Sequence, residues 1–322
     1  MNYAVTGATG FVAKHLIDRL VREGFLVTAI SRMGTGRDDV KDLVLDYQDL
    51  NLLRKAFTKI DVVIHLAARA HHLNESVSTN DIDYKYYKAN VMSTKLVANA
   101  AQLAGVKRVV FISSVGVNGT CTNGVAFSID DIPSPTEPYS KSKWVAEKAL
   151  AETLKDGATD YVILRPPLVY GPQCRGNFQR LLKIAFTLPL LPLAGLNAPR
   201  TFIGVHNLVD GIMVSAQKNS LSRKTFLIAD NCELSVGKII IILVKGLGKP
   251  SWKVINLPTT MLGFFAFLVG RGDVWRKLSA PLQVDGSDFI RASGWLPPVD
   301  TEVGLLEMAE SFLANRCQIN KK

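Results

Sequence analysis

The chain has 322 residues, of which 48% are hydrophobic and 20% charged, and its formal net charge is +10 at pH 7. This length and balance exclude a disordered chain and suit one large globular domain or two closely joined ones. The positive charge points to an anionic partner. Because the sequence has no basic stripe with interleaved aromatic residues, a phosphate-bearing small molecule is favoured over nucleic acid.

Four cysteines, at positions 121, 174, 232 and 317, are far apart and show no C-x-x-C spacing. We expect reduced thiols in a cytoplasmic protein, with neither disulfides nor a metal site. A glycine turn begins at residue 6, so we expect no signal peptide before it. The apolar stretches 239–244 and 261–269 are shorter than the roughly 18–20 residues that span a bilayer, so no transmembrane segment is expected.

The N-terminal stretch TGATGFVAKHL, residues 6–16, follows a short apolar run and opens a helical pattern. Strand, tight turn and helix start succeed one another here, with glycine at positions where the chain must turn and where a phosphate must come close. The free N–H groups and positive dipole end of such a helix can bind a pyrophosphate. The pattern predicts a dinucleotide site rather than a merely structural turn, with these contact residues: Gly7, Thr9, Gly10, Phe11 and Val12.

A second strand, predicted over residues 25–31, ends in Ser31-Arg32 instead of the acidic residue that accepts the ribose hydroxyls of NAD. An arginine there can pair with a 2′-phosphate or stack over adenine, so NAD and NADP both remain open, with a slight lean to NADP. Arg37, further along the loop, could serve the same phosphate or lie in solvent.

Next comes a short strand over residues 43–45, ending at Asp46, which could accept from the adenine amino group or cap the following helix. The strand predicted over residues 61–66 ends at Leu66. Ala67 and Ala68 follow it and are small enough for the chain to pass close to the cofactor.

A long helix is predicted over residues 79–105, with Asn90 among apolar positions, as either a satisfied core group or a site residue. The strand at 106–113 is nearly continuously apolar and places Ser114 at its carboxyl end, where open α/β sheets bind ligands. A helix begins at Tyr139, and a sixth strand covers residues 161–164. Six alternations of strand and helix predict a doubly wound, Rossmann-type parallel sheet.

After Pro172 the alternation fails, and prolines punctuate shorter elements. We expect a smaller C-terminal α/β lobe formed by residues 171–200 and 231–322. The cofactor-binding domain then comprises residues 1–170 and about 201–230, with the stretch 200–205 returning the chain to the sheet.

Tyr139 and Lys143 are four residues apart, so at a helix start their side chains share one face. A phenol is too weakly acidic to act as a base near neutral pH, but a neighbouring ammonium and a positive nicotinamide favour the phenolate. Ser114 can hydrogen-bond the same substrate oxygen. This predicts that Tyr139 moves a proton while the cofactor moves a hydride at the same carbon.

With these residues in place, the sequence resembles the extended short-chain dehydrogenase/reductases, in particular the NAD-dependent sugar-nucleotide epimerase/dehydratase group. The resemblance covers nearly the whole chain and rests on the glycine turn, Asn90, and four further stretches: HLAAR at 65–69, FISS at 111–114, YSKSK at 139–143 and RPPLVYGP at 165–172. It implies a catalytic triad of Ser114, Tyr139 and Lys143, supported by Asn90, with Tyr139, Lys143 and Pro166 also beside the cofactor.

The resemblance also implies substrate-binding residues. Asn177, in the stretch GNFQRL, is placed like the family's diphosphate ligand, and Arg200 and Arg276 are placed like its phosphate-binding arginines. A surface salt bridge is the alternative for each arginine. His71, with His72, would lie near the sugar or in a loop without a role.

Two stretches, HLAARAHHLNES and SSVGVNG, look most like bacterial enzymes that act on UDP-N-acetylhexosamines in O-antigen synthesis. The expected activity is 4-epimerisation of a UDP-hexose or UDP-N-acetylhexosamine through a transient 4-keto sugar. A net 4-ketoreductase of a UDP-4-keto-6-deoxyhexosamine and an epimerase of a polyprenyl-diphosphate-linked sugar remain alternatives. A dehydratase is disfavoured because Val115 and Gly116 stand where an Asp-Glu pair is expected.

Two questions of assembly stay open. The apolar stretch 257–268 could be a core helix of the small lobe, which its flanking glycine and proline favour, or could lie on a membrane surface. Family members pair through two long helices, here residues 79–104 and 138–155, so a homodimer is expected.

Overall fold

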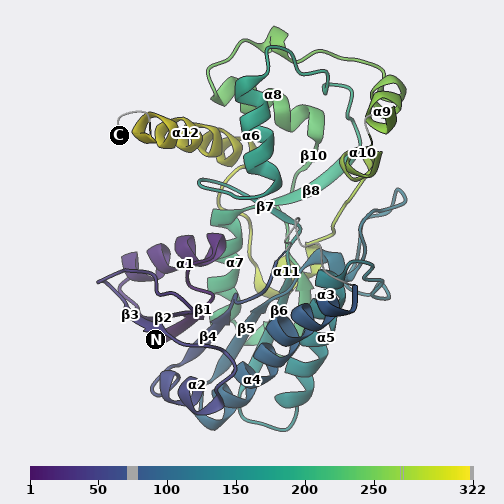
Figure 1. The fold of residues 1–322 in the computed structure, drawn as a ribbon. Coiled ribbons are helices and arrows are strands. Elements are labelled where there is room, and N and C mark those ends of the chain that lie inside the picture. The colour runs from purple at the N-terminus through teal and green to yellow at the C-terminus, as the bar shows by residue number, and fades with distance from the viewer. Residues whose placement is uncertain (71–78, 269, 271, 320–322) are drawn as a thin grey trace.

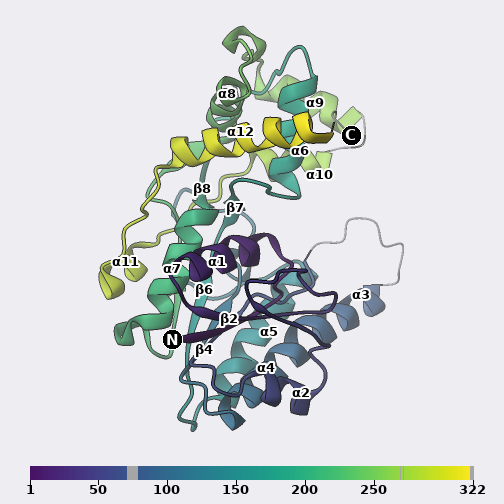
Figure 2. The same cartoon turned by 90° about the vertical axis from the view of Figure 1, so that its left-hand side faces the viewer.

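A computed structural model describes residues 1–70, 79–268, 270 and 272–319. It shows two parts: a large lobe around a parallel sheet, and a small lobe that stands at one end of it (Figure 1). Figure 2 shows the same arrangement from the side, with the long C-terminal helix lying across the small lobe.

The large sheet contains seven parallel strands in the spatial order β3-β2-β1-β4-β5-β6-β9. The strands are β1 (Asn2–Thr6), β2 (Leu26–Ser31), β3 (Lys41–Val44), β4 (Val62–His65), β5 (Arg108–Ile112), β6 (Asp160–Arg165) and β9 (Lys224–Leu227). The strand order reverses between β1 and β4, and ligands of open α/β sheets bind at such a switch point. The predicted doubly wound fold is confirmed.

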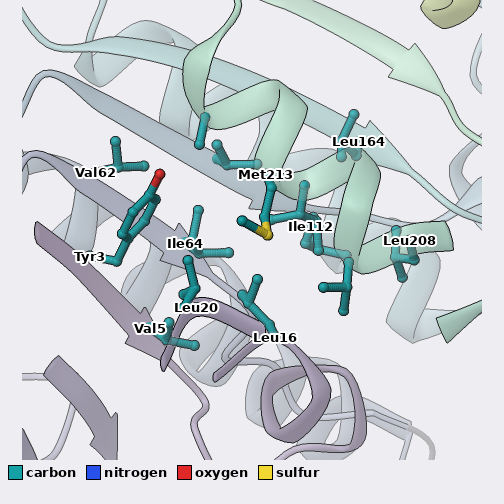
Figure 3. Close-up of a cluster of buried hydrophobic side chains, with 14 of the residues drawn as sticks. Tyr3, Val5, Leu16, Leu20, Val62, Ile64, Ile112, Leu164, Leu208 and Met213 are labelled. Carbon is teal, nitrogen blue, oxygen red and sulfur yellow. The ribbon is translucent and has the colours of Figure 1, made fainter. Parts of the chain in front are cut away.

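Helices cover both faces of this sheet. One face carries α1 (Phe11–Arg22), α7 (Val205–Gln217) and α11 (Ser287–Ser293); the other carries α2 (Leu50–Ala56), α4 (Ser93–Leu103) and α5 (Pro138–Thr153). In β5, Val110 and Ile112 belong to the first core and Val109 and Phe111 to the second. Figure 3 shows the first core, where α1 and α7 pack on the strands. Burial on both faces explains why the central strands are mostly apolar.

The single helix predicted over residues 79–105 consists of three consecutive pieces: α3 (Thr79–Tyr86), a π-helical segment η1 (Tyr87–Met92) and α4. Asn90 lies in the π-helical segment and is 1% exposed. Wider π turns change the direction of a side chain and frequently mark functional sites.

The small lobe has its own sheet, in the order β10-β8-β7. Its strands are β7 (Leu168–Tyr170), β8 (Pro199–Gly204) and β10 (Glu233–Ser235), and its helices are α6 (Asn177–Thr187), α8 (Val236–Gly246), α9 (Thr259–Leu268), α10 (Gly272–Ser279) and α12 (Thr301–Ile319). The described part of the chain also contains three short 3-10 turns: η2 (Val115–Val117), η3 (Asn219–Leu221) and η4 (Ser251–Lys253).

One sequence expectation about this sheet is wrong. The stretch 200–205 does not return the chain to the large sheet, because β8 pairs with β7 and β10. Pro166 and Pro167 have no N–H group to continue the β6 ladder, so the chain leaves the large sheet there and β7 offers β8 a partner. The return is made by α7 and β9, which pairs with β6.

The preference for a core helix at residues 257–268 is also wrong. In α9, Met261, Phe264, Phe267 and Leu268 are 47%, 60%, 74% and 61% exposed. The helix contacts the lobe through Gly263, where an added Cβ would lie 2.8 Å from Trp275 Nε1. Within the described ranges, no helix combines the length and apolar character needed to cross a bilayer.

Candidate active site

The glycine turn between β1 and α1 closes against the end of β4. Gly7 has φ of +68°, and a Cβ there would lie 2.8 Å from the backbone of Ala67, so both the turn and the close approach require glycine. The Gly10 N–H donates to the Gly7 carbonyl at 2.8 Å. Among the side chains that the structure describes, none caps the start of α1, where Gly10 is the N-cap. The first N–H groups of this helix therefore suit an anion.

The remaining predicted contacts surround this turn. Thr9 lies within it, and Phe11 and Val12 begin α1. Phe11 also packs against the small-lobe core, which ties the turn to that lobe. Leu66 and Ala67, directly after β4, touch the turn, and exposed Ala68 follows them.

Tyr47 is a residue of this turn that sequence reasoning missed. Its buried hydroxyl donates to the Ile30 carbonyl and accepts from the Gly7 N–H, both at 2.8 Å. Burial raises the pKa of Tyr47 to about 12, so the phenol stays neutral and fixes the glycine turn to β2. The only sequence signal was an aromatic residue directly after Asp46.

The polar atoms of this edge fit a dinucleotide. Four buried side-chain oxygens of the described residues have no hydrogen-bond partner in the protein: Ser31 Oγ, Thr35 Oγ1, Asp42 Oδ1 and Ser113 Oγ. Ser31 ends β2 and Ser113 directly follows β5, so they lie at the carboxyl edge on either side of β1 and β4. Buried hydroxyls are normally paired, and a ligand rich in hydroxyl and phosphate groups would pair them.

The charged residues near β2 separate into two kinds. Arg37 forms ion pairs with Asp18 and Asp39, so two carboxylates already neutralise its charge. Arg32 and Asp46 are exposed at the ends of β2 and β3. Asp46 is not a helix cap; Asp49 caps α2 by accepting from the Leu52 N–H at 3.0 Å.

A buried chain of hydrogen bonds runs from the cofactor turn to Asn90. The Ala67 N–H donates to Thr6 Oγ1 at 3.3 Å, and Thr6 Oγ1 lies 2.7 Å from His65 Nδ1. On the other side, His65 Nε2 lies 3.0 Å from Thr94 Oγ1, which donates to the Asn90 carbonyl at 2.6 Å. Since Thr94 gives its proton to that carbonyl, His65 must donate from Nε2 and accept at Nδ1. Burial lowers the pKa of His65 to about 3, which keeps this tautomer neutral.

The side chain of Asn90 connects three segments. Its Oδ1 accepts from the Arg69 N–H at 2.7 Å, and its Nδ2 donates to the Arg69 carbonyl at 3.2 Å and to Ser142 Oγ at 2.8 Å. Asn90 is thus a satisfied buried amide that joins the chain after β4 to the helix that carries Tyr139 and Lys143.

Ser114 lies against the first turn of that helix. The Ser114 hydroxyl caps η2 by accepting from the Gly116 N–H at 3.1 Å. A Cβ on Gly116 would lie 2.3 Å from Ser140 Oγ and 3.4 Å from Ser114 Oγ, so glycine here lets the two segments meet. Behind them, the Pro166 carbonyl accepts from the Val115 N–H at 2.9 Å.

Tyr139 and Lys143 lie on α5 over the end of β5. Lys143 is 2% exposed, and its Nζ lies 4.2 Å from the centre of the Phe111 ring. Burial lowers the pKa of Lys143 to about 7. Burial raises the pKa of Tyr139 to about 12, and the nearby Tyr86 adds a smaller effect in the same direction. The predicted lowering of this pKa depends on the positive nicotinamide as well as on Lys143, and it stays a prediction.

The predicted substrate residues belong to the small lobe. Asn177 is exposed at the first position of α6, Arg200 is half-buried in β8, and Arg276 is exposed on α10. Burial lowers the pKa of Arg200. His71 and His72 lie outside the described residues.

The fold and this site define a dinucleotide-dependent enzyme. The model of the NAD dependent epimerase/dehydratase family matches residues 3–229. A Vibrio cholerae protein named UDP-glucose 4-epimerase is 32% identical, over 96% of this chain and 94% of its own length. The chain belongs to the NAD-dependent epimerase/dehydratase family, and NAD is its cofactor.

Further comparisons agree. An Escherichia coli O157:H7 protein named N-acetyl-alpha-D-glucosaminyl-diphospho-ditrans,octacis-undecaprenol 4-epimerase is 27% identical, over 94% of this chain and 93% of its own length. The Thermotoga maritima UDP-glucose 4-epimerase structure with UDP-glucose superimposes with a TM-score of 0.78 at 21% identity, over 98% of this chain and all of that one. The structure of a Bacillus cereus UDP-glucuronic acid 4-epimerase with NAD superimposes with a TM-score of 0.77 at 23% identity. The match covers 98% of this chain and 99% of that one. These structures show the same fold.

Proposed function

We propose that the chain is a sugar-nucleotide 4-epimerase that acts on a UDP-hexose or UDP-N-acetylhexosamine. The main support is the contact of Gly116 with Ser140, which brings the hydroxyl of Ser114 against the start of the helix that carries Tyr139 and Lys143. All three side chains then lie at the edge of the sheet where the glycine turn suits a pyrophosphate. The Vibrio cholerae relative named UDP-glucose 4-epimerase favours the same activity.

The residues of the turn, Gly7 to Val12, with Ser31 and Ala67, would hold NAD, which supplies a hydride acceptor and donor beside the sugar. The Tyr139 phenolate takes the proton from the sugar O4 hydroxyl, and the Ser114 hydroxyl donates a hydrogen bond to the same oxygen. Protonated Lys143 favours the phenolate. After the 4-keto sugar has turned its other face, Tyr139 returns the proton to O4.

The small lobe supplies the nucleotide contacts in this proposal. Asn177, Arg200 and Arg276 bind the diphosphate, for which a guanidinium fork provides paired donors. The cofactor-binding domain is proposed for residues 1–170 with about 201–230, and the substrate-binding domain for 171–200 with 231–322. Three elements depart from these bounds: β7 and β8 belong to the small-lobe sheet, and α11 packs on the large sheet.

A net 4-ketoreductase is the second candidate, because Ser31-Arg32 leaves room for the 2′-phosphate of NADPH at the end of β2. Incubation with UDP-glucose, UDP-N-acetylglucosamine and their 4-epimers separates the two. Product sugars are resolved by chromatography, and absorbance is followed at the reduced-nicotinamide band. Interconversion at constant absorbance supports the epimerase. Turnover of none of the four, with oxidation of NADPH by a UDP-4-keto-6-deoxyhexosamine, contradicts it and supports the reductase.

We also propose a cytoplasmic homodimer that serves bacterial O-antigen or capsule synthesis. Exposed apolar side chains on α3, η1 and α4 support pairing through these helices and α5: Tyr84, Tyr87, Met92 and Leu103. Light scattering of the purified protein tests the dimer, and Leu103→Glu should shift it to a monomer. A wild-type monomer at micromolar concentration contradicts this part of the proposal.

A further inference from the structure

The positive charge of the chain is concentrated in the small lobe. The segments 171–200 and 236–277 together contain 11 of the 38 Lys and Arg residues but only one of the 28 Asp and Glu residues. The rest of the chain contains 27 of each, so its charges cancel. The net charge of +10 therefore equals the charge of these two segments.

The same two segments carry a group of exposed apolar side chains, which we call the lobe tip. Its members lie after α6, in η4 and in α9, and are 45–74% exposed: Leu188, Leu190, Trp252, Met261, Phe264, Phe267 and Leu268. The segments are neighbours, because the Leu191 N–H donates to the Lys253 carbonyl at 2.8 Å and the Ile255 N–H donates to the Leu191 carbonyl at 3.0 Å. Figures 1 and 2 show α9 in the part of the small lobe away from the large sheet.

The exposed apolar side chains that the structure describes in α9 occupy one side of the helix. Met261, Phe264 and Leu268 follow an i, i+3, i+7 spacing, and Phe267 lies next to them. Gly263 packs on Trp275 from another side. The helix has 10 residues, too few to span a bilayer. Its composition and its exposure suit a helix that lies in the plane of a membrane surface.

We propose that the lobe tip docks on the surface of an anionic lipid bilayer. Aromatic and aliphatic side chains of α9 and Trp252 enter the interface, and exposed basic residues of the two segments, such as Arg180, Lys183 and Lys238, face the lipid phosphates. A bilayer accounts for both observations at once: the apolar side chains explain insertion, and the excess of eleven basic residues over one acidic residue explains selection of anionic lipid. The proposal does not depend on which sugar the enzyme converts.

Co-sedimentation with vesicles tests this docking. The full-length protein is mixed with vesicles of equal parts phosphatidylglycerol and phosphatidylcholine, or of phosphatidylcholine alone, at low and high salt. We expect binding to the anionic vesicles, about tenfold weaker on neutral ones, and weakening as salt rises. Phe267→Glu combined with Leu268→Glu should lower the binding about tenfold or more.

The matched control is Leu26→Glu, which places the same charge at a 71% exposed apolar residue of the large lobe. It should bind vesicles like the wild type, and both variants should turn over soluble UDP-sugar like the wild type. Equal binding of the α9 variant and the wild type overturns the proposal. A second result also overturns it: the wild type does not bind vesicles but self-associates, and replacement of Phe267 and Leu268 abolishes the self-association. The lobe tip would then be an interface between two copies of the chain.

Discussion

The side-chain amide of Asn90 donates to the hydroxyl of Ser142 at 2.8 Å, which joins a π-helical turn to the helix that carries Tyr139 and Lys143. The Ser142 hydroxyl in turn donates to the Tyr139 carbonyl at 2.7 Å. Asn90 thus acts on the backbone of Tyr139 through one intermediate hydroxyl and has no need to touch a substrate.

Replacing Asn90 by Ala should lower kcat by roughly tenfold to a hundredfold, because small displacements of a catalytic group have effects of this size. The dissociation constant for NAD should change little. Ser142→Ala, which removes only the link to Tyr139, should reproduce part of the loss in kcat. Steady-state kinetics and nucleotide titration measure both, and an Asn90→Ala variant with normal kcat contradicts the positioning role.

His65 should stay neutral in the folded protein down to about pH 3, with its proton on Nε2. Nitrogen-15 NMR of the imidazole at pH 6 reports this tautomer directly. His65→Phe keeps the ring but leaves Thr6 and Thr94 without these partners, so unfolding should cost roughly 2–4 kcal/mol less free energy. An imidazole that titrates near pH 6 would show that the buried chain of hydrogen bonds is not formed.

Gly7 and Gly24 distinguish two reasons why a position requires glycine: a positive φ and a close approach of another backbone segment. Both have positive φ, +68° and +79°, but a Cβ on Gly24 meets nothing within 4 Å whereas one on Gly7 meets the Ala67 backbone. Gly24→Ala should therefore cost only about 1–2 kcal/mol of stability. Gly7→Ala should cost more and weaken NAD binding at least about tenfold, as the turn moves away from β4. Thermal unfolding and nucleotide titration compare the two variants, and equal effects would contradict the close approach.

Lys143 makes stability depend on pH in a direction that follows from its burial. Its pKa falls from 10.5 to about 7 on folding, so between these values the unfolded chain binds one proton more. Stability should therefore rise with pH above about pH 7, by at most about 1.4 kcal/mol per unit, and show no such slope below it. Denaturant unfolding should show that the free energy of unfolding rises more between pH 7 and pH 9 in the wild type than in Lys143→Met. Parallel changes in the two proteins would contradict a depressed pKa.

The sequence predicts the large lobe well because its signals are local. Apolar strands, a glycine turn and alternating helices each leave a pattern within a few residues, and the resulting sheet places Ser114 at its carboxyl edge as expected. Tyr47 and His65 were not recognised as parts of the site because their roles come from hydrogen bonds to residues 40 and 59 positions away. No short-range pattern records such bonds.

The errors arise where tertiary context decides between equal local patterns. The strand at 199–204 has the apolar character of a core strand and could join either sheet; its partners depend on where β7 leaves the large sheet. The apolar run of α9 has the composition of a core helix, yet the helix contacts the lobe through Gly263 and leaves four large apolar side chains exposed: Met261, Phe264, Phe267 and Leu268. The sequence also does not show how deeply Tyr139 is buried, which raises the pKa of its phenol.

The most direct test of the whole account is turnover by Tyr139→Phe. This variant keeps the ring beside Tyr86 and loses only the hydroxyl, so its thermal unfolding and its affinity for NAD should match the wild type. If Tyr139 moves the proton at the sugar O4, interconversion of the UDP-sugar should fall by about a hundredfold to ten-thousandfold. Turnover equal to that of the wild type would contradict the proposed chemistry.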